Sequence, residues 1–211
     1  MNESMFIHET EAKKNGFRFV FGVDEAGRGP LAGPVVASAV CLKDHHFSCR
    51  IDDSKKLSAK AREKAFDEIT HQAYVGIGII SESGIDEINI LNATFLAMEI
   101  AVNRLTDQLS LHTNVEPSIK DIQILVDGNA FKTKLPYQYK TIVGGDASSL
   151  SIACASIIAK TYRDRIMDQY DRIYPQYGFR QHKGYPTQAH RLAISTHGPS
   201  LIHRRTFQGA L

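Results

Sequence analysis

The sequence predicts an α/β fold, with a mixed five-stranded sheet flanked by helices and a helical C-terminal part. Five short apolar segments have the length and composition of buried strands. The first three strands are interrupted by one helical segment, and the last two alternate with long helices. A chain of 211 residues is long enough to form one domain with a substantial core.

The N-terminal half is expected to supply the first three strands. We predict strand one over Phe17–Val23 and strand two over Pro34–Leu42, and the glycine-rich turn between them favours antiparallel pairing. Ser58 is a candidate N-cap for a helix over Ala59–Ala73. The third strand is predicted over Tyr74–Ser81.

A long helix is predicted over about Asn89–Gln108, before the last two strands. One apolar face of this helix is defined by residues with helical spacing: Leu91, Phe95, Met98, Val102 and Leu105. The apolar segment Ile122–Val126 is predicted as strand four and is followed by Asp127. Tyr139–Val143 is predicted as strand five and leads to Asp146.

The remainder of the chain is predicted to be mainly helical. Ser148 or Ser149 caps the next helix, over Leu150–Tyr170, whose first part is small and apolar and is expected to be buried. Residues 160–165 are polar or charged and are expected to be exposed. A last short helix is predicted over Thr187–Thr196.

The composition limits the class of protein. The net charge of +2 excludes a highly basic coat for nucleic acid, although separate basic clusters occur along the chain. No segment reaches the length of a membrane-spanning helix, and the N-terminus lacks the pattern of a signal peptide. The three cysteines, Cys41, Cys49 and Cys154, form no CxxC pair, which fits a reducing cytoplasm.

Acidic residues follow three of the predicted strands. Asp24 and Glu25 come after the first strand, Asp127 after the fourth and Asp146 after the fifth. A single acidic pair before a glycine-rich turn is usually turn chemistry. Three such strand ends favour a shared site, because ligands bind at the carboxyl ends of strands in α/β sheets. Carboxylate oxygens are ligands of the kind that Mg²⁺ and Mn²⁺ prefer.

A glycine-rich segment, Gly27-Arg28-Gly29, follows the first acidic pair. Glycine lets a backbone approach a ligand closely, and Arg28 adds a fixed positive charge. An acidic metal site beside such a backbone suggests a site for a phosphate-bearing polymer.

Five short motifs occur in order along the chain. They are Asp-Glu-Ala-Gly-Arg-Gly-Pro at 24–30, Asp-Ser-Lys-Lys-Leu-Ser at 53–58, Asp-Gly-Asn at 127–129, Gly-Gly-Asp at 144–146 and His-Lys-Gly-Tyr-Pro-Thr at 182–187. In this order they resemble bacterial type 2 ribonuclease H (ribonuclease HII), from about Phe17 to Phe207. The resemblance implies a ribonuclease H-like fold and an endonuclease that cleaves RNA in RNA–DNA hybrids. It also implies cleavage on the 5′ side of a single ribonucleotide embedded in duplex DNA, leaving 3′-hydroxyl and 5′-phosphate ends.

By this resemblance, four acids are the catalytic and metal-binding residues: Asp24, Glu25, Asp127 and Asp146. Four carboxylates in one pocket repel each other and hold protons unless a cation joins them. Two divalent ions, Mn²⁺ or Mg²⁺, would relieve that repulsion and stabilise the attacking and leaving oxygens of a phosphoryl displacement. We expect Asp24 and Asp127 to be shared ligands, with Glu25 and Asp146 completing the two shells.

The resemblance also implies that Gly27, Arg28, Gly29 and Tyr185 recognise the ribonucleotide. The 2′-hydroxyl distinguishes RNA from DNA, and we expect the glycine backbone and the Tyr185 hydroxyl to contact it while the ring stacks on the next sugar. Candidate phosphate contacts, which position a substrate without selecting it, are Ser54, Lys55, Lys56 and Lys183. Two histidines are interpreted as half-buried structural residues in preference to proton donors: His182 and His203.

We expect a single catalytic domain over 1–211, with a leader segment over 1–16 and a substrate-contacting part over about 170–211. Too few residues precede Asp24 for the extra N-terminal substrate-binding domain of the related type 3 enzymes. The implied substrates are RNA–DNA hybrids and ribonucleotide-containing duplex DNA. We expect a cytoplasmic monomer without a membrane or an obligate protein partner, acting in ribonucleotide removal from DNA.

Two other functions stay open on the sequence alone. Another polynucleotidyl transferase of the same fold, such as a junction resolvase or an integrase-like enzyme, would share the carboxylates but would not need Gly27-Arg28-Gly29 or Tyr185. A non-enzymatic nucleic-acid-binding module would use the acids only as caps. Cleavage of a duplex with one ribonucleotide against an all-DNA junction tests the first alternative, and metal-dependent cleavage tests the second.

Overall fold

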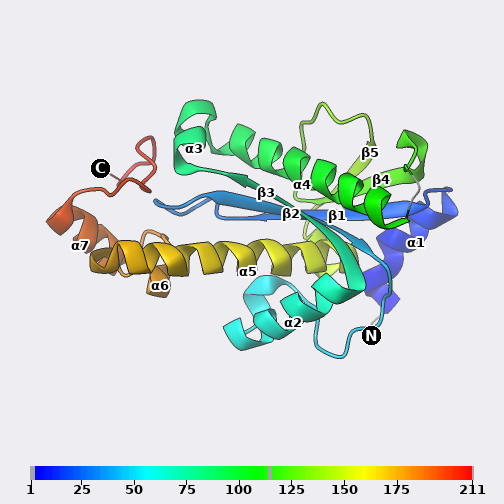
Figure 1. The fold of residues 1–211 in the computed structure, drawn as a ribbon, viewed down its shortest axis with the longest axis horizontal. Helices are drawn as coiled ribbons and strands as arrows, with labels where there is room; N and C mark the ends of the chain where they lie inside the picture. Colours follow the sequence, from blue (N-terminus) through cyan, green and yellow to red (C-terminus); the bar gives the residue numbers. More distant parts are fainter. Residues whose placement is uncertain (1–2, 114–115, 211) are drawn as a thin grey trace.

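A mixed five-stranded sheet forms the centre of the computed structural model, which describes residues 3–113 and 116–210 (Figure 1). The strand order is β3-β2-β1-β4-β5. The strands are β1 (Phe19–Ala26), β2 (Val35–Leu42), β3 (Ala73–Ile80), β4 (Ile122–Asp127) and β5 (Gln138–Ile142). β2 is antiparallel to both β1 and β3, whereas β1, β4 and β5 run parallel. The predicted fold class is confirmed.

Helices cover both faces of the sheet. They are α1 (Ile7–Lys14), α2 (Ala59–Gln72), α3 (Glu82–Ile88), α4 (Ile90–Thr113), α5 (Leu150–Ile173), α6 (Phe179–His182) and α7 (Gln188–His197). α4 packs on β3 and β2 on one face, and α5, with α2 beside it, packs on β1 and β2 on the other (Figure 1). Short 3₁₀ helices include η2 (Ser54–Lys56) and η4 (Gly145–Ala147). Residues 1, 2 and 211, at the ends of the predicted leader and C-terminal parts, lie outside the described residues.

Two helices begin at capping residues that the sequence predicts, and a third begins at a cap that it does not. The Ser58 hydroxyl accepts the Ala61 amide at 3.2 Å, and the Ser149 hydroxyl accepts the Ile152 amide at 3.3 Å. Thr187 caps α7 in the same way. Each cap satisfies an amide that has no partner within its helix. The predicted α2 cap is therefore confirmed, and Ser149 is the cap of α5.

The strand β1 brings both helical layers close to its acidic end. Phe21 and Val23 belong to the core on the α4 side, so the alternating residues Gly22 and Asp24 face α5. A Cβ at Gly22 would lie 2.1 Å from the backbone carbonyl carbon of Ser151. Glycine at this position therefore lets α5 approach the strand directly beside Asp24.

The predicted end of strand one is wrong by three residues. β1 continues to Ala26 because its pairing with β2 runs on through Asp24↔Ser38 and Ala26↔Val36. Asp24 and Glu25 therefore lie within the strand, and the backbone hydrogen bonds of the sheet hold them rigidly.

The predicted apolar face of α4 is partly wrong. Leu91 is 45% exposed, whereas Ala93, Ala97 and Ala101 are completely buried. These alanines share the buried face with Met98, so the helix lies close to the sheet through small residues. Hydrophobic spacing alone does not detect a face made of alanine.

Residues 160–165 are not uniformly exposed, as was predicted from their polarity. Thr161 is 2% exposed and Arg163 is completely buried. The Arg163 guanidinium is buried because backbone carbonyl groups accept its hydrogen bonds. Three further α-helices, α1, α3 and α6, were not predicted. Among the described residues, no helix is long and apolar enough to cross a membrane.

Candidate active site

The parallel strands β1 and β4 place Asp24 and Asp127 next to each other. Val23 of β1 is in register with Val126 of β4, so the residue after each lies at the same carboxyl edge of the sheet. Asp146 returns to this edge after β5, because the Gly145 amide donates to Asp127 Oδ1 at 2.7 Å. The sheet therefore brings together the acids that the sequence predicts as one site.

Burial and mutual repulsion make Asp24 an unusual carboxylate. Asp24 is 6% exposed. Burial raises the pKa of Asp24 well above its usual range, and the charges of Glu25 and Asp127 raise it further. Hydrogen bonds from Ser156 and from the Glu25 amide, the latter at 2.7 Å, favour the ionised form but do not offset these effects.

Two of the other acids share this behaviour. Burial raises the pKa of Glu25, and the guanidinium of Arg28, 3.4 Å away, opposes that rise. Burial also raises the pKa of Asp146, to which Asp127 and Asp53 add repulsion. The carboxyl edge is therefore rich in carboxylate oxygens whose ionised forms are destabilised by burial and repulsion. Such a site is expected to bind a cation.

Replacing Asp24 with Asn is expected to raise the free energy of unfolding at neutral pH in a buffer with a chelator. Because folding raises the pKa of Asp24 above its unfolded value, the ionised carboxylate destabilises the folded state. The stabilisation by Asn should shrink as the pH falls through the raised pKa, since Asp24 then takes up a proton. Urea denaturation at a series of pH values measures the difference. A difference that grows toward acid pH would contradict this account.

A fifth carboxylate, Asp53, lies beside the site and was not assigned a role from the sequence. Its Oδ1 accepts the Lys55 amide at 2.9 Å at the start of η2, and its carboxyl interacts with Asp146. Partial burial lowers the pKa of Lys55, but Asp53, Asp146, Asp24 and Asp127 together raise it. The Lys55 ammonium therefore faces the acids of the site.

The acidic edge has the ligand type that a divalent cation prefers, but its side chains are not gathered into a ready coordination site. In residues 3–113 and 116–210, no three His, Cys, Asp or Glu side chains form a ready group of metal ligands. The donors at the edge are carboxylate oxygens, which hard divalent cations prefer. A bound cation would also stabilise the ionised forms that burial and repulsion oppose.

The segment Gly27-Arg28-Gly29 and Tyr185 lie together, as the sequence predicts. A Cβ at Gly29 would lie 3.8 Å from Cε1 of Tyr185, and the Leu31 amide donates to the Gly184 carbonyl at 2.8 Å. Tyr185 is 39% exposed, so its ring borders open space. The strand β1 leads directly from the acids into this segment.

The two glycines of this segment have different surroundings. Gly27 is buried with φ of 101°, and a Cβ there would lie 2.1 Å from Nε of Arg163. Gly29 is exposed and would meet only the Tyr185 ring, at ordinary contact distance. Gly27 therefore packs against the protein, whereas Gly29 leaves room for a ligand.

The predicted phosphate contacts do not share one environment. Ser54 is 3% exposed, and its hydroxyl lies 2.9 Å from that of Ser156. Lys183 forms an ion pair with Asp168, and Lys56 forms one with Asp52 at 3.2 Å. Of these residues, Lys55 is the one whose charge acts on the carboxylates of the acidic edge, including Glu25 and Asp146.

Histidines support the Tyr185 segment from inside the protein. His182 is 9% exposed and stacks on His190 with 4.3 Å between ring centroids. Nδ1 of His190 lies 3.0 Å from the Tyr185 carbonyl oxygen, and Nε2 of His190 lies 3.1 Å from Nε2 of His203. Burial lowers the pKa of His190 and of His203 to about 4, so both are neutral at pH 7. The sequence did not single out His190.

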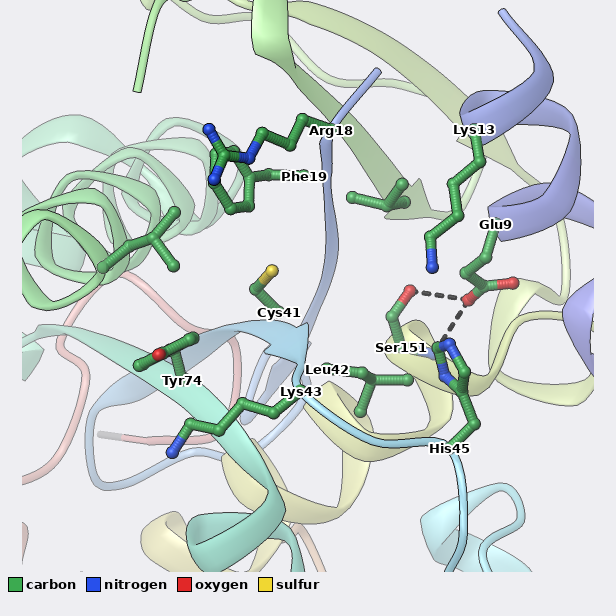
Figure 2. Close-up of a pocket in the computed structure, with 12 residues that line it drawn as sticks. Glu9, Lys13, Arg18, Phe19, Cys41, Leu42, Lys43, His45, Tyr74 and Ser151 are labelled. Carbon is green, nitrogen blue, oxygen red and sulfur yellow. Dashed lines mark hydrogen bonds between the residues drawn. The ribbon is translucent and has the colours of Figure 1, made fainter. Parts of the chain in front are cut away.

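A separate cavity lies at the other end of β1 (Figure 2). Its volume is about 300 Å³, and it is bordered by Glu9, Arg18 and Tyr74. Glu9 is buried and accepts the Ser151 amide at 2.9 Å, so it ties α1 to the start of α5. None of the predicted site residues lines this cavity. The carboxyl edge of the sheet is therefore the candidate active site.

The strand order and the acidic edge together define a ribonuclease H-like enzyme. The sequence model of the ribonuclease HII family matches residues 21–210, and the chain belongs to that family. It is therefore a nuclease of the ribonuclease H type.

Individual relatives agree with this assignment. The chain is 47% identical to a ribonuclease HII of Syntrophotalea carbinolica over 207 residues, which cover 98% of this chain and 93% of the relative. It resembles the crystal structure of ribonuclease H2 from Pyrococcus horikoshii, with a TM-score of 0.69, 25% identity and coverage of 91% and 95%. Bst-RNase HIII in complex with Mn²⁺ shares the fold, with a TM-score of 0.66, 17% identity and coverage of 94% and 70%.

Proposed function

We propose that this protein is an endoribonuclease that hydrolyses the RNA strand of RNA–DNA hybrids and cuts on the 5′ side of single ribonucleotides in duplex DNA. Family membership supports the general activity. The observation that supports the finer specificity is the nearness of the exposed Gly29 to Tyr185, where an added Cβ would lie 3.8 Å from the ring, next to the acids on β1. A role in removing ribonucleotides from DNA follows from that specificity.

Four residues would hold the divalent ions: Asp24, Glu25, Asp127 and Asp146. Two ions, Mn²⁺ or Mg²⁺, would supply a metal-bound nucleophilic water and charge stabilisation at the departing 3′ oxygen. Asp24 and Asp127 are proposed as shared ligands because they are adjacent across β1 and β4 and act on each other electrostatically. The Mn²⁺ in the related fold of Bst-RNase HIII supports this class of cation.

The protein's own groups would orient the substrate. The exposed backbone at Arg28 and Gly29 is proposed to contact the 2′-hydroxyl of the ribonucleotide. The carbonyl groups of Gly27 and Arg28 already accept hydrogen bonds from Arg204, at 2.6 and 3.1 Å. The amide groups are therefore the freer part of this backbone. The Tyr185 ring would stack on the next sugar, which excludes water from one side of the scissile bond.

The chain is proposed to act as a monomer, with residues 170–210 contributing to substrate contact. α7 and the C-terminal segment lie beyond the end of α5 (Figure 1). The isolated bridge Ala32↔His203 joins the C-terminal segment to the glycine-rich loop. This connection supports a single catalytic unit, in which the C-terminal part shapes the site.

Cleavage of a single-ribonucleotide duplex and of an all-DNA four-way junction tests the proposed activity against a junction resolvase. With Mn²⁺ or Mg²⁺ present, the duplex should be cut and the junction left intact. Addition of a chelator should stop cleavage. A non-enzymatic binding module would cleave neither substrate, with or without metal. Preferential cutting of the junction would contradict the proposal.

Lys55→Ala and Lys183→Ala are expected to weaken binding to RNA–DNA hybrids and to single-ribonucleotide duplexes by similar factors. Each lysine that neutralises a phosphate releases counterions, so each loss should flatten the dependence of log affinity on log salt by roughly one unit. Fluorescence anisotropy over a salt series measures both quantities. Lys120→Ala, at an exposed position before β4, is the control. A loss confined to one substrate would show that the side chain selects the substrate.

A further inference from the structure

Two arginines, Arg163 of α5 and Arg204, are completely buried behind the glycine-rich loop 27–34. In the described part of the chain, neither guanidinium forms an ion pair with a carboxylate; backbone carbonyl groups accept their hydrogen bonds. Burying a charge without a close counter-ion is costly. Burial lowers the pKa of both groups, that of Arg204 to about 9. Since an apolar side chain could fill the same space at a lower cost, the burial of these two charges indicates a specific role.

Arg204 holds the glycine-rich loop from within. Its Nε and Nη2 donate to the Gly33 carbonyl at 2.9 and 2.7 Å. Nη2 also donates to the Gly27 carbonyl at 2.6 Å, and Nη1 donates to the Arg28 carbonyl at 3.1 Å. One planar group therefore fixes both ends of the loop.

Arg163 differs because it connects two loops. Its Nε donates to the Pro34 carbonyl at 2.9 Å and its Nη2 to the Ala32 carbonyl at 3.1 Å, both in the glycine-rich loop. Its Nη1 donates to the Lys183 carbonyl at 3.0 Å, two residues before Tyr185. The guanidinium thus spans the two segments that carry the proposed ribonucleotide contacts.

The surroundings of Arg163 leave little freedom in this connection. Gly27 packs on Nε of Arg163 so closely that a Cβ would overlap it. At Gly184 a Cβ would lie 2.4 Å from the Ala32 carbonyl oxygen, so the two loops are also in direct contact. The Arg163 guanidinium lies 5.9 Å from the centroid of the Tyr185 ring. A small change at Arg163 would alter the distance between Gly29 and Tyr185.

We propose that Arg163 is a positioning residue for ribonucleotide recognition: it fixes the spacing between the glycine-rich loop 27–34 and the loop 183–185. The inference rests on the proposed function, because it assigns a consequence to the spacing of Gly29 and Tyr185. A lysine cannot replace Arg163, since its compact ammonium cannot span three carbonyl groups with fixed planar geometry. A role confined to stability would leave the properly folded variant fully competent.

The test is Arg163→Lys, with Arg165→Lys as the matched control on the same helix. Arg165 is exposed, pairs with Glu63 and lies over the Phe66 ring, away from both loops. Single-turnover cleavage of a one-ribonucleotide duplex at saturating Mn²⁺ should slow by about 10- to 100-fold in Arg163→Lys, because small misplacements of recognition groups have effects of that order. Affinity for the same duplex should be unchanged, and the control should match the wild type.

A double-mutant cycle with Tyr185→Ala separates positioning from a general loss of stability. If Arg163 acts by placing Tyr185, the double variant should be less impaired than the product of the two single effects. Independent, multiplicative effects would overturn the inference, as would a wild-type rate in folded Arg163→Lys. If Arg163→Lys does not fold, Gly184→Ala displaces the same loops, and an unchanged rate there overturns it. Failure of the wild type to cut at the ribonucleotide would instead refute the proposed function.

Discussion

Asp24→Asn and Asp127→Asn are each expected to lower the cleavage rate by orders of magnitude. Each substitution removes a ligand charge while keeping the shape of the side chain, and metal stabilisation of a phosphoryl-transfer transition state is worth several kcal/mol. Binding of the duplex should be affected less, since phosphate contacts lie outside the acids. Asp24→Asn should also be the more stable protein without metal, so lost activity cannot be attributed to unfolding.

Single-turnover rates at saturating Mg²⁺ or Mn²⁺, with calorimetric titration of the metal, measure this effect. Asp107→Asn, at an exposed position on α4, is a matched control and should cleave like the wild type. Near-normal cleavage by either Asp24→Asn or Asp127→Asn would show that the four-carboxylate assignment is wrong.

Gly29→Val is expected to abolish cleavage at a single ribonucleotide and leave the metal-binding acids in place. The structure supports this separation: a Cβ at Gly29 meets only the Tyr185 ring, at 3.8 Å, so a larger side chain fills substrate space without displacing the core. The acids are held by β1 and β4 and should still bind metal. Thermal unfolding and calorimetry check that fold and metal binding persist.

Tyr185→Ala should slow the same reaction about tenfold or more, because stacking on an aromatic ring is worth roughly 1–3 kcal/mol per base and somewhat less on a sugar. Tyr185→Phe keeps the ring and should lose only the hydroxyl contact, so it is the matched comparison. If Gly29→Val and Tyr185→Ala both cut a one-ribonucleotide duplex normally, ribonucleotide recognition lies elsewhere. Only the catalytic part of the account would then stand.

The sheet and its acids were predictable because short-range pattern determines them. The alternating strands, the Ser58 cap and the acids near strand ends are all local features of the sequence. The convergence of Asp24 and Asp127 follows from parallel pairing, which the α/β pattern already implies. The local sequence pattern did not predict where β1 ends, because its pairing with β2 determines that end.

The supporting residues could not be predicted because contacts distant in sequence define them. Arg163 has the polarity of a surface residue, yet it is buried by carbonyls from Ala32, Pro34 and Lys183. Asp53 becomes a neighbour of Asp146 only when η2 lies against the carboxyl edge.

The most direct test of the central claim is a nucleotide-resolution map of the cut in a DNA duplex with one embedded ribonucleotide. Both strands are end-labelled, and the chemical nature of the new ends is determined with and without Mn²⁺. The account predicts one metal-dependent cut on the 5′ side of the ribonucleotide, leaving a 3′-hydroxyl and a 5′-phosphate. A cut on the 3′ side, a cyclic phosphate end, or equal cleavage of the all-DNA duplex would contradict it.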